Sequence, residues 1–472
     1  MLAEGRRLTR SGREMPETLH VLLVSYVFPP AGGVGALRAA SLARHLPAED
    51  IRLDVVTTRN PSAVGADPTL LEGISDAVTV HRTLTIDVPF RVKKWMKRVI
   101  TGNKQSASNA KKAAGTGEPS FRKRLIQDLL LPDPQVTWVP VLKRAARRII
   151  RKRKIDVVLI TVPPFSALLL VEHLRKRFPQ LSIVVDFRDE WLSTAIDLVG
   201  FSRSERARSL ARDTEAAAVN NASAVVAVTN AAQREIRGRY PQLPGDKFHL
   251  IPNGFDAARL RSAMPESMPP AESKIVISHI GTVYASTEPS TLVAAFQSLP
   301  PGIKLRFRFR FIGHIEEQRF RDSLLQLGDA VELRGFLPQR EALSAMYEAD
   351  YVLLVQHGPL NVAAKFFDYI GGGKPVLATV HPKSDERVLL EELRAGWWAP
   401  DRDVDAIRQL LLDTAARGKA PFSDFKPDRA KIAQYERKVL AQRYAALLHS
   451  VADTAREKQS QEQETLAGGR KS

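Results

Sequence analysis

Residues 365–377 read KFFDYIGGGKPVL, and this stretch says more about the fold than any other in the chain. It predicts a short helix, a turn of three glycines and an apolar strand that opens at Pro375. Lys365, Asp368 and Tyr369 stand at i, i+3 and i+4, so they share one helical face. A helix N-terminus with a lysine suits a phosphate, and a carboxylate can accept hydrogen bonds from two ribose hydroxyls. An ordinary helix–strand connection capped by glycine accounts for the same residues equally well.

Length and composition indicate a globular protein of two domains. The chain has 472 residues, 44% of them hydrophobic, and no cysteine. The lack of cysteine excludes disulfides, thiolate metal sites and a cysteine nucleophile. The first 20 residues lack the apolar core of a signal peptide, and the longest uncharged stretch, residues 157–171, is too short to span a membrane. We therefore expect a soluble or peripheral protein.

Positive charge is concentrated in one segment. Residues 88–154 contain 19 lysines and arginines against three acidic residues, a net charge of +16 out of +18 for the whole chain. A local basic block indicates a local anionic partner. Within it, residues 91–100 place Trp95 and Met96 on the apolar face of a helix whose other face is basic. We predict that this helix lies on an anionic membrane surface; a helix packed on its own domain is the alternative.

Strands and helices alternate along the first half of the chain. An apolar run at residues 20–27 ends in a glycine-rich loop, and a helix over 36–46 and a strand over 51–57 follow. This pattern predicts the first unit of a Rossmann-like sheet, although the loop lacks the third glycine of the dinucleotide fingerprint. Further strands are expected at 157–161, 183–186 and 224–228. Because these strands are almost entirely apolar, we expect a parallel sheet with helices on both faces.

The same pattern restarts after a polar linker at residues 264–273, so we predict an α/β fold of two doubly wound parallel-sheet domains with the ligand in a central cleft. The expected strands of the second domain are 275–280, 307–313, 331–333, 351–355 and 376–379. The predicted organisation is a flexible leader (1–17), an N-terminal domain (18–255) with a basic insertion at about 88–125, a C-terminal domain (256–430), a helix that packs back (431–455) and a disordered tail (456–472).

Several motifs occur in the order found in a known family. They are the loop at 28–35 followed by Arg38, TVPPFS at 161–166, DFRDEW at 186–191, IPNGFD at 251–256, HIGT at 279–282 and GFLP at 335–338. With residues 365–377 they resemble the retaining glycosyltransferases of family 4, which have the GT-B fold, in a branch common in the synthesis of bacterial surface polysaccharides such as lipopolysaccharide. The resemblance extends over about residues 20–450. It implies two Rossmann-like domains that face a central cleft.

The resemblance also implies a function and a set of site residues. The protein would move a sugar, with retention, from a nucleotide-diphosphate sugar on the C-terminal domain to a lipid-linked or polysaccharide acceptor on the N-terminal domain. Gly33 and Lys365 are the candidate catalytic residues. The candidate donor-binding residues are Gly32, Gly33, Gly281, Thr282, His314, Phe336, Leu337, Lys365 and Asp368. The candidate acceptor-side residues are Arg38, Asp186, Arg188 and Asp189.

Partners and location follow from the same reasoning. No metal or other cofactor is expected, because the ten histidines show no ligand spacing. A nucleic-acid partner is not expected either, because the basic block contains no recognition motif. We expect a cytoplasmic protein that binds peripherally to the inner face of the cytoplasmic membrane.

Two departures from the family pattern leave other functions open. The loop at 281–287 lacks the usual arginine and lysine, and Leu360 stands where the first glutamate of a Glu-x7-Glu pair is expected. Asp368 replaces the second glutamate, which shortens the side chain by one methylene. Lys365, Arg38 and His314 are the candidates for holding the diphosphate instead. A non-catalytic relative and a nucleotide-sugar epimerase of the same fold are the alternatives.

Overall fold

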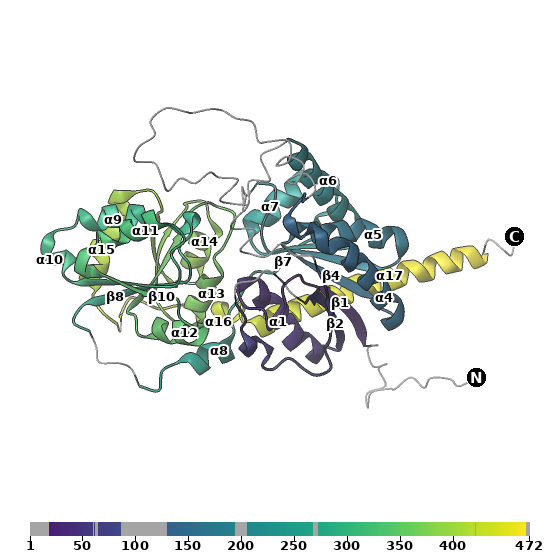
Figure 1. Ribbon diagram of the computed structural model, residues 1–472, viewed down its shortest axis with the longest axis horizontal. Helices are drawn as coiled ribbons and strands as arrows, with labels where there is room; N and C mark the ends of the chain where they lie inside the picture. The colour runs from purple at the N-terminus through teal and green to yellow at the C-terminus, as the bar shows by residue number, and fades with distance from the viewer. Residues whose placement is uncertain are drawn as a thin grey trace. The chain divides into compact units, whose positions relative to one another are not determined.

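The computed structural model describes residues 18–59, 61, 65–85, 130–193, 205–267, 272–420 and 422–468 (Figure 1). The chain divides into two compact units. The first comprises the chain up to Ala227, Glu235–His249 and the chain from Ala441 onward; the second comprises Val228–Arg234 and Leu250–Leu440. The predicted leader, the basic insertion and the helix with Trp95 and Met96 lie outside the described residues.

The first unit is built on a seven-stranded sheet in the order β3-β2-β1-β4-β5-β6-β7. The strands are β1 (Leu19–Val24), β2 (Ile51–Thr58), β3 (Thr79–Thr83), β4 (Val157–Val162), β5 (Ser182–Phe187), β6 (Ala224–Ala227) and β7 (Phe248–Leu250). β1 pairs in parallel with β2 and with β4, so Val21 lies opposite both Leu53 and Val157. This is the Rossmann order, and the chain changes direction between β1 and β4.

Helices cover this sheet. They are α1 (Val34–His45), α4 (Val139–Arg153), α5 (Leu169–Arg177), α6 (Glu205–Asn221) and α7 (Asn230–Arg239), with short 3₁₀ turns at Leu46–Ala48, Pro68–Leu71, Pro134–Trp138, Phe165–Leu168 and Gly245–Lys247. The glycine-rich loop after β1 turns into α1 at Gly33, whose φ of +89° favours glycine. α4 begins next to Pro140 and ends at Lys154, which adopts the left-handed conformation of a helix C-terminus.

The second unit repeats the design with a six-stranded sheet in the order β10-β9-β8-β11-β12-β13. Its strands are β8 (Ile275–Ile280), β9 (Phe307–Ile312), β10 (Val331–Gly335), β11 (Tyr351–Gln356), β12 (Val376–Val380) and β13 (Gly396–Pro400). Its helices are α8 (Ala257–Ala263), α9 (Ser290–Gln297), α10 (Pro301–Lys304), α11 (Gln318–Leu325), α12 (Gln339–Tyr347), α13 (Ala364–Gly371), α14 (Asp385–Glu392), α15 (Val404–Arg417) and α16 (Arg429–Ala433), with 3₁₀ turns at Ala285–Thr287 and Gly328–Ala330.

Both faces of the second sheet are buried, as the apolar strands predict. Along β11, Tyr351, Leu353 and Val355 belong to one core cluster. Val352 and Leu354, on the opposite side, belong to another. Alternation between two apolar layers is what a parallel strand covered by helices on both faces requires. The predicted fold class, two Rossmann-like doubly wound units, is confirmed.

The C-terminal helix α17 (Arg437–Gly468) differs from the prediction of a helix ending at 455 and a disordered tail. It continues as helix from 456 to 468. The first part is anchored on the first unit, where the Ser182 hydroxyl donates to the carbonyl of Val451 at 2.9 Å. Farther along, the side-chain amide of Gln180 donates to Glu462 at 2.9 Å. Once a packed segment has nucleated a helix, each further residue adds a hydrogen bond at little cost, even in a polar sequence.

Gly371, Gly372 and Gly373 lie at the C-terminal end of α13, where the first two are needed for packing and the third for its backbone conformation. A Cβ on Gly371 would lie 2.4 Å from the ring of Phe255, and a Cβ on Gly372 would lie 2.4 Å from the terminal methyl of Met346. Gly373 has a φ of +69°. Helix α13 therefore approaches its neighbours more closely than any residue with a side chain at these positions allows.

We predict that Gly371→Ala lowers the free energy of unfolding by about 1–3 kcal/mol, the usual effect of overpacking a core. Urea denaturation of the intact protein measures the change. Gly302→Ala is the matched control, because a Cβ at Gly302 meets nothing within 4 Å. Equal stability of the two variants would contradict the close packing of α13.

Candidate functional site

The candidate site of the second unit lies at the carboxyl ends of β8 and β11. These neighbouring strands are where the chain of this sheet changes direction, and ligands of doubly wound sheets bind at such points. Gly281 and Thr282 follow β8, and α13 follows the loop after β11. Glycines with positive φ lie at the carboxyl edge of this sheet. Gly281, Gly313 and Gly358 follow β8, β9 and β11, and Gly335 ends β10.

Tyr369 fixes α13 against the end of β8. Its hydroxyl accepts a hydrogen bond from the backbone N–H of Ile280 at 3.0 Å and also reaches the carbonyl of Ile280 at 3.4 Å. The side chain is buried, so Tyr369 does not share an open face with Lys365. Its role is to hold the first turn of α13 beside Gly281.

Lys365 is the cation that this anchoring brings to the site. Its Nζ lies 2.7 Å from Nε2 of His279, and a Cβ on Gly281 would lie 3.8 Å from the same Nζ. Burial lowers the pKa of Lys365 to about 7. Burial, with the nearby lysine, lowers the pKa of His279 well below its usual value. His279 is therefore neutral and accepts the hydrogen bond that Lys365 donates.

Asp368 lies one helical turn after Lys365 and is half-buried. Burial raises the pKa of its carboxyl to about 6, while Arg437 and Arg259 pull it down and Asp256 raises it. At neutral pH the carboxylate is charged and can accept hydrogen bonds. The structure thus places Lys365 and Asp368 in the arrangement that the sequence predicts, a cation and a carboxylate on one helix at a strand end.

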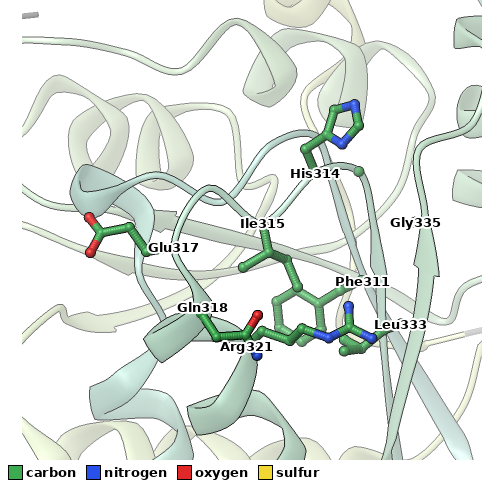
Figure 2. A pocket seen from close by; sticks show the side chains of 9 residues that line it. Phe311, His314, Ile315, Glu317, Gln318, Arg321, Leu333 and Gly335 are labelled. Carbon is green, nitrogen blue, oxygen red and sulfur yellow. The ribbon is translucent and has the colours of Figure 1, made fainter. Parts of the chain in front are cut away.

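A hollow lies beside this point, at the carboxyl ends of β9 and β10 (Figure 2). Its volume is about 210 Å³, and its lining consists of Phe311, Gly313, His314, Ile315, Glu317, Gln318, Arg321, Leu333 and Gly335. Figure 2 shows His314 at one rim and Arg321 from α11 near Phe311 and Leu333. A Cβ on Gly313 would lie 2.4 Å from the carbonyl oxygen of Gly281, so the loops after β8 and β9 touch.

His314 and Phe336 form an aromatic pair at the rim of this hollow. Their ring centroids are 5.1 Å apart, with 15° between the ring planes. The side chain of Phe336 is 64% exposed, which is unusual for a phenylalanine. Leu337 follows it in the loop after β10 and is half-buried. An exposed aromatic face next to a hollow of this size can stack on a flat ligand ring.

In the first unit, Gly32 and Gly33 form the loop between β1 and α1. The N–H of Gly32 donates to the carbonyl of Gly65 at 3.2 Å. A Cβ on Gly33 would meet nothing within 4 Å, so the need for glycine at this position comes from its positive φ. The predicted contact of these glycines with a ligand stays a prediction.

Arg38 and Asp186 belong to a buried network. The guanidinium of Arg38 donates to both carboxylate oxygens of Asp186 at 3.0 Å, and the Tyr444 hydroxyl donates to Asp186 at 2.8 Å. Arg38 also donates to the Tyr444 hydroxyl at 3.1 Å. Burial alone would lower the pKa of Arg38, but the charge of Asp186 and these hydrogen bonds raise it. Asp186 is fully buried, so the structure gives this pair a structural function and their predicted acceptor role stays a prediction.

Arg188 joins the two loops where the chain of the first sheet changes direction. Its guanidinium donates to the carbonyls of Gly35, Val162 and Pro163, the first at 2.6 Å and the second at 3.3 Å. Burial lowers the pKa of Arg188, and burial also raises the pKa of the neighbouring Asp189. Arg188 thus ties the start of α1 to the end of β4, a function that the motif alone does not reveal.

The sequence analysis did not identify three residues that the structure places in or beside these sites. His279 reads as a core histidine but pairs with Lys365. Glu386 is buried, accepts the N–H of Ala363 at the start of α13 at 3.0 Å and has its pKa raised by burial to about 8. Tyr444 lies 258 residues from Asp186. No local pattern in the sequence indicates partners so distant along the chain.

We predict that Tyr444→Phe lowers the free energy of unfolding by about 1–3 kcal/mol, because it leaves the buried Asp186 carboxylate with one donor fewer. Urea denaturation measures the loss. Lys438→Gln, an exposed change at the start of the same helix, serves as the control and is expected to have little effect. A Tyr444→Phe protein as stable as the wild type would mean that the hydroxyl does not support the buried pair.

Comparisons with known proteins agree with the sequence motifs. The sequence model of Glycosyltransferase Family 4 matches residues 109–259. WcaL of Escherichia coli strain K12, whose name gives a proposed role as a glycosyltransferase of colanic acid biosynthesis, is 28% identical over 179 residues. That match covers 36% of this chain and 42% of the relative, so the chain spans less than half the length of the curated relative it matches.

Solved structures show the fold. The sucrose-phosphate synthase of Thermosynechococcus elongatus is 17% identical with a TM-score of 0.61, covering 92% of this chain and 100% of that one. Anabaena HepE, solved in complex with UDP-glucose, is 16% identical with a TM-score of 0.52, covering 94% and 100%. The chain therefore resembles glycosyltransferase family 4 in sequence and shares the two-domain GT-B fold of these solved structures, as its motifs predict.

Proposed function

We propose that the protein transfers a sugar from a nucleotide-diphosphate sugar to a lipid-linked or polysaccharide acceptor, with retention of the anomeric configuration. The observation that carries this proposal is the pair of Lys365 and Asp368 on α13, held by Tyr369 at the end of β8. The solved complex of HepE with UDP-glucose supports a donor of this class, because that protein shares the fold. The name of WcaL supports an acceptor in polysaccharide synthesis.

Lys365 and the start of α13 are suited to the leaving group. When the bond between the sugar and the diphosphate breaks, the electron pair stays on the diphosphate, and its negative charge needs stabilisation. Lys365 is a nearby cation that His279 orients, and the N-terminal end of α13 adds the positive end of a helix dipole. Lys365 thus takes the place of the arginine and lysine that the loop at 281–287 lacks.

The other parts of the donor, and the acceptor, can be assigned to the remaining candidate residues. Asp368 would accept hydrogen bonds from the ribose hydroxyls. The base would enter the hollow at the ends of β9 and β10, beside Phe336 and His314. Gly281 and Thr282 would face the diphosphate. Gly32 and Gly33 would leave room for the sugar, with Arg188 and Asp189 on the acceptor side.

No cofactor is part of the proposal. The described ranges contain no group of three or more histidine, aspartate or glutamate side chains that could hold a metal ion. Within the same ranges, no helix is long and apolar enough to cross a membrane. We propose a cytoplasmic enzyme bound peripherally to the inner face of the membrane, with Trp95 and Met96 in contact with lipid.

Release of nucleoside diphosphate tests the proposal. The purified protein is incubated with common nucleotide sugars and with lipid-linked acceptors extracted from cells. If the protein transfers sugar, nucleoside diphosphate is released only when an acceptor is present. Nuclear magnetic resonance of the product then reports the anomeric configuration. An epimerase would change the donor sugar without an acceptor, and a non-catalytic relative would bind the donor without turnover; either result would replace the proposal.

We predict that Asp368→Ala leaves the fold intact and weakens donor binding by about 1.5–3 kcal/mol, the usual value of hydrogen bonds to a charged group. Asp368→Glu restores the family's residue and should retain binding. Isothermal titration with nucleoside diphosphates measures both affinities, and circular dichroism checks the fold. Wild-type affinity in Asp368→Ala would remove Asp368 from the donor site.

We predict that nucleoside-diphosphate affinity is highest between about pH 6 and pH 7. Below pH 6 the carboxyl of Asp368, with a pKa raised to about 6, takes up a proton and no longer accepts ribose hydroxyls. Above pH 7 the ammonium of Lys365, with a pKa lowered to about 7, loses its charge. Lys365→Arg stays charged and should abolish the decline on the alkaline side. A flat profile from pH 5 to 9 at constant ionic strength would rule out both roles.

A further inference from the structure

The first turn of α13 has no cap within its own sequence. Ala363, the N-cap residue, has no side chain that can accept a hydrogen bond. Phe366 stands at the third helical position, where the glutamate of a capping box would reach back to the N–H of the N-cap residue. Phe366 donates its own N–H to the carbonyl of Ala363 at 3.0 Å. The N–H of Ala363 therefore needs a partner from another part of the fold.

Glu386 of α14 supplies this partner. Its Oε1 accepts the N–H of Ala363 at 3.0 Å, across 23 residues of the chain. Glu386 is the second residue of α14, and only 1% of its surface is exposed. A glutamate from a neighbouring helix thus does for α13 what the third helical residue does in a capping box.

The surroundings of Glu386 favour a neutral carboxyl group. Its second oxygen, Oε2, is buried and has no hydrogen-bond partner among the described residues. Burial, together with the charge of Asp385, raises the pKa of Glu386 to about 8, and the N–H of Ala363 and the nearby Ser384 hydroxyl offset this only in part. A buried carboxylate with an unpaired oxygen would be costly, so the carboxylic acid is the main form at neutral pH.

The cations around α14 and α13 are engaged elsewhere. Arg387, the next residue of α14, bonds to a glutamate of its own helix at 2.7 Å. Arg234 lies 3.8 Å from Asp385. On α13, Lys365 donates to a histidine of β8 at 2.7 Å. None of these three cations pairs with Glu386, so no positive charge stabilises its ionised form from these elements.

The cap sets the start of the helix that carries the candidate donor-binding side chains. Lys365 and Asp368 follow Ala363 by two and by five residues. The loop before α13 is held at its other end as well, because the Thr229 hydroxyl donates to the carbonyl of Leu360 at 2.8 Å. With both ends of this loop fixed, the direction of the first turn of α13 is fixed too.

We propose that Glu386 is a positioning residue of the donor site, where its neutral carboxyl group caps α13 and so fixes Lys365 and Asp368 relative to β8. The inference rests on the proposed function for its ligand, but the cap itself can be measured without a ligand. Because the side chain acts as a neutral acceptor, glutamine can replace it, whereas an apolar side chain of similar size cannot.

Two variants of the full chain test the cap. Glu386→Gln keeps a carbonyl oxygen for the N–H of Ala363, and Glu386→Leu removes the acceptor at similar volume. Glu392→Leu is the matched control, because Glu392 is an exposed residue at the other end of the same helix. Amide hydrogen exchange of the ligand-free protein reports on the first turn of α13. Isothermal titration with UDP and with GDP reports the nucleotide affinity, and circular dichroism checks the fold.

In Glu386→Leu, exchange of the amides at 366–368 should become about tenfold faster, the usual effect of one lost hydrogen bond. Nucleotide affinity should fall by about the same factor. Glu386→Gln and Glu392→Leu should match the wild type in both measurements. The proposal is overturned if Glu386→Leu behaves like the wild type, or if Glu386→Gln loses as much as Glu386→Leu does.

The pH dependence of stability tests the neutral form and does not require Glu386→Leu to fold. Because the pKa of Glu386 is raised in the folded chain, the folded state keeps a proton that the unfolded chain releases above about pH 5. Stability should decline as the pH rises from about 5 to about 8, and the wild-type unfolding constant should increase by up to tenfold per pH unit relative to Glu386→Gln. Parallel curves for the two proteins would mean that the carboxyl group is ionised, which would overturn the proposal.

The two readouts separate this proposal from the proposed function. If no protein binds either nucleotide but exchange in the first turn of α13 rises in Glu386→Leu alone, the cap is supported and the proposed donor site is wrong. If the wild type and Glu386→Leu bind nucleotide equally well, the donor site is supported and the positioning role of Glu386 is wrong.

Discussion

The candidate site of the second unit depends on the contact between α13 and the end of β8. The Tyr369 hydroxyl bonds to the backbone of Ile280, directly before Gly281. This contact sets the helix so that Lys365, one turn earlier, reaches His279 within the strand. Gly371 and Gly372 let the other end of α13 pack closely against Phe255 and Met346.

A lysine held in this way has unusual chemistry. Burial next to a neutral histidine lowers its pKa toward neutrality, so its charge depends on what occupies the site. A bound diphosphate would favour the ammonium form. In the proposed function, Lys365 would serve where the family pattern has an arginine and a lysine after β8. Asp368, whose pKa is raised by burial, lies three residues farther along α13.

The first unit uses buried charge differently, to hold its loops. Arg38 is paired with Asp186 and Tyr444, and Arg188 is bonded to three carbonyl oxygens, one at the start of α1 and two at the end of β4. Farther on, Arg239 donates to the buried Glu190 at 2.7 Å and to Glu215 at 2.8 Å. Residues of the DFRDEW motif that look suited to a ligand therefore have partners within the fold. Removing one member of such a network would leave an uncompensated buried charge.

The sequence by itself determined the two sheets and the place of the candidate site, because alternating apolar strands and helices permit few arrangements. It did not reveal the outer strands β3, β7 and β13. β3 is polar, β7 has only three residues, and β13 begins with glycine and ends with proline, so none shows the apolar run of the inner strands. It placed Lys365 and Asp368 on one helix by local spacing alone. Only the tertiary structure decided that His279 would meet Lys365, that Asp186 would face Tyr444, and that residues 456–468 would continue α17. Those outcomes depend on packing between segments distant along the chain, and no periodicity within a segment encodes them.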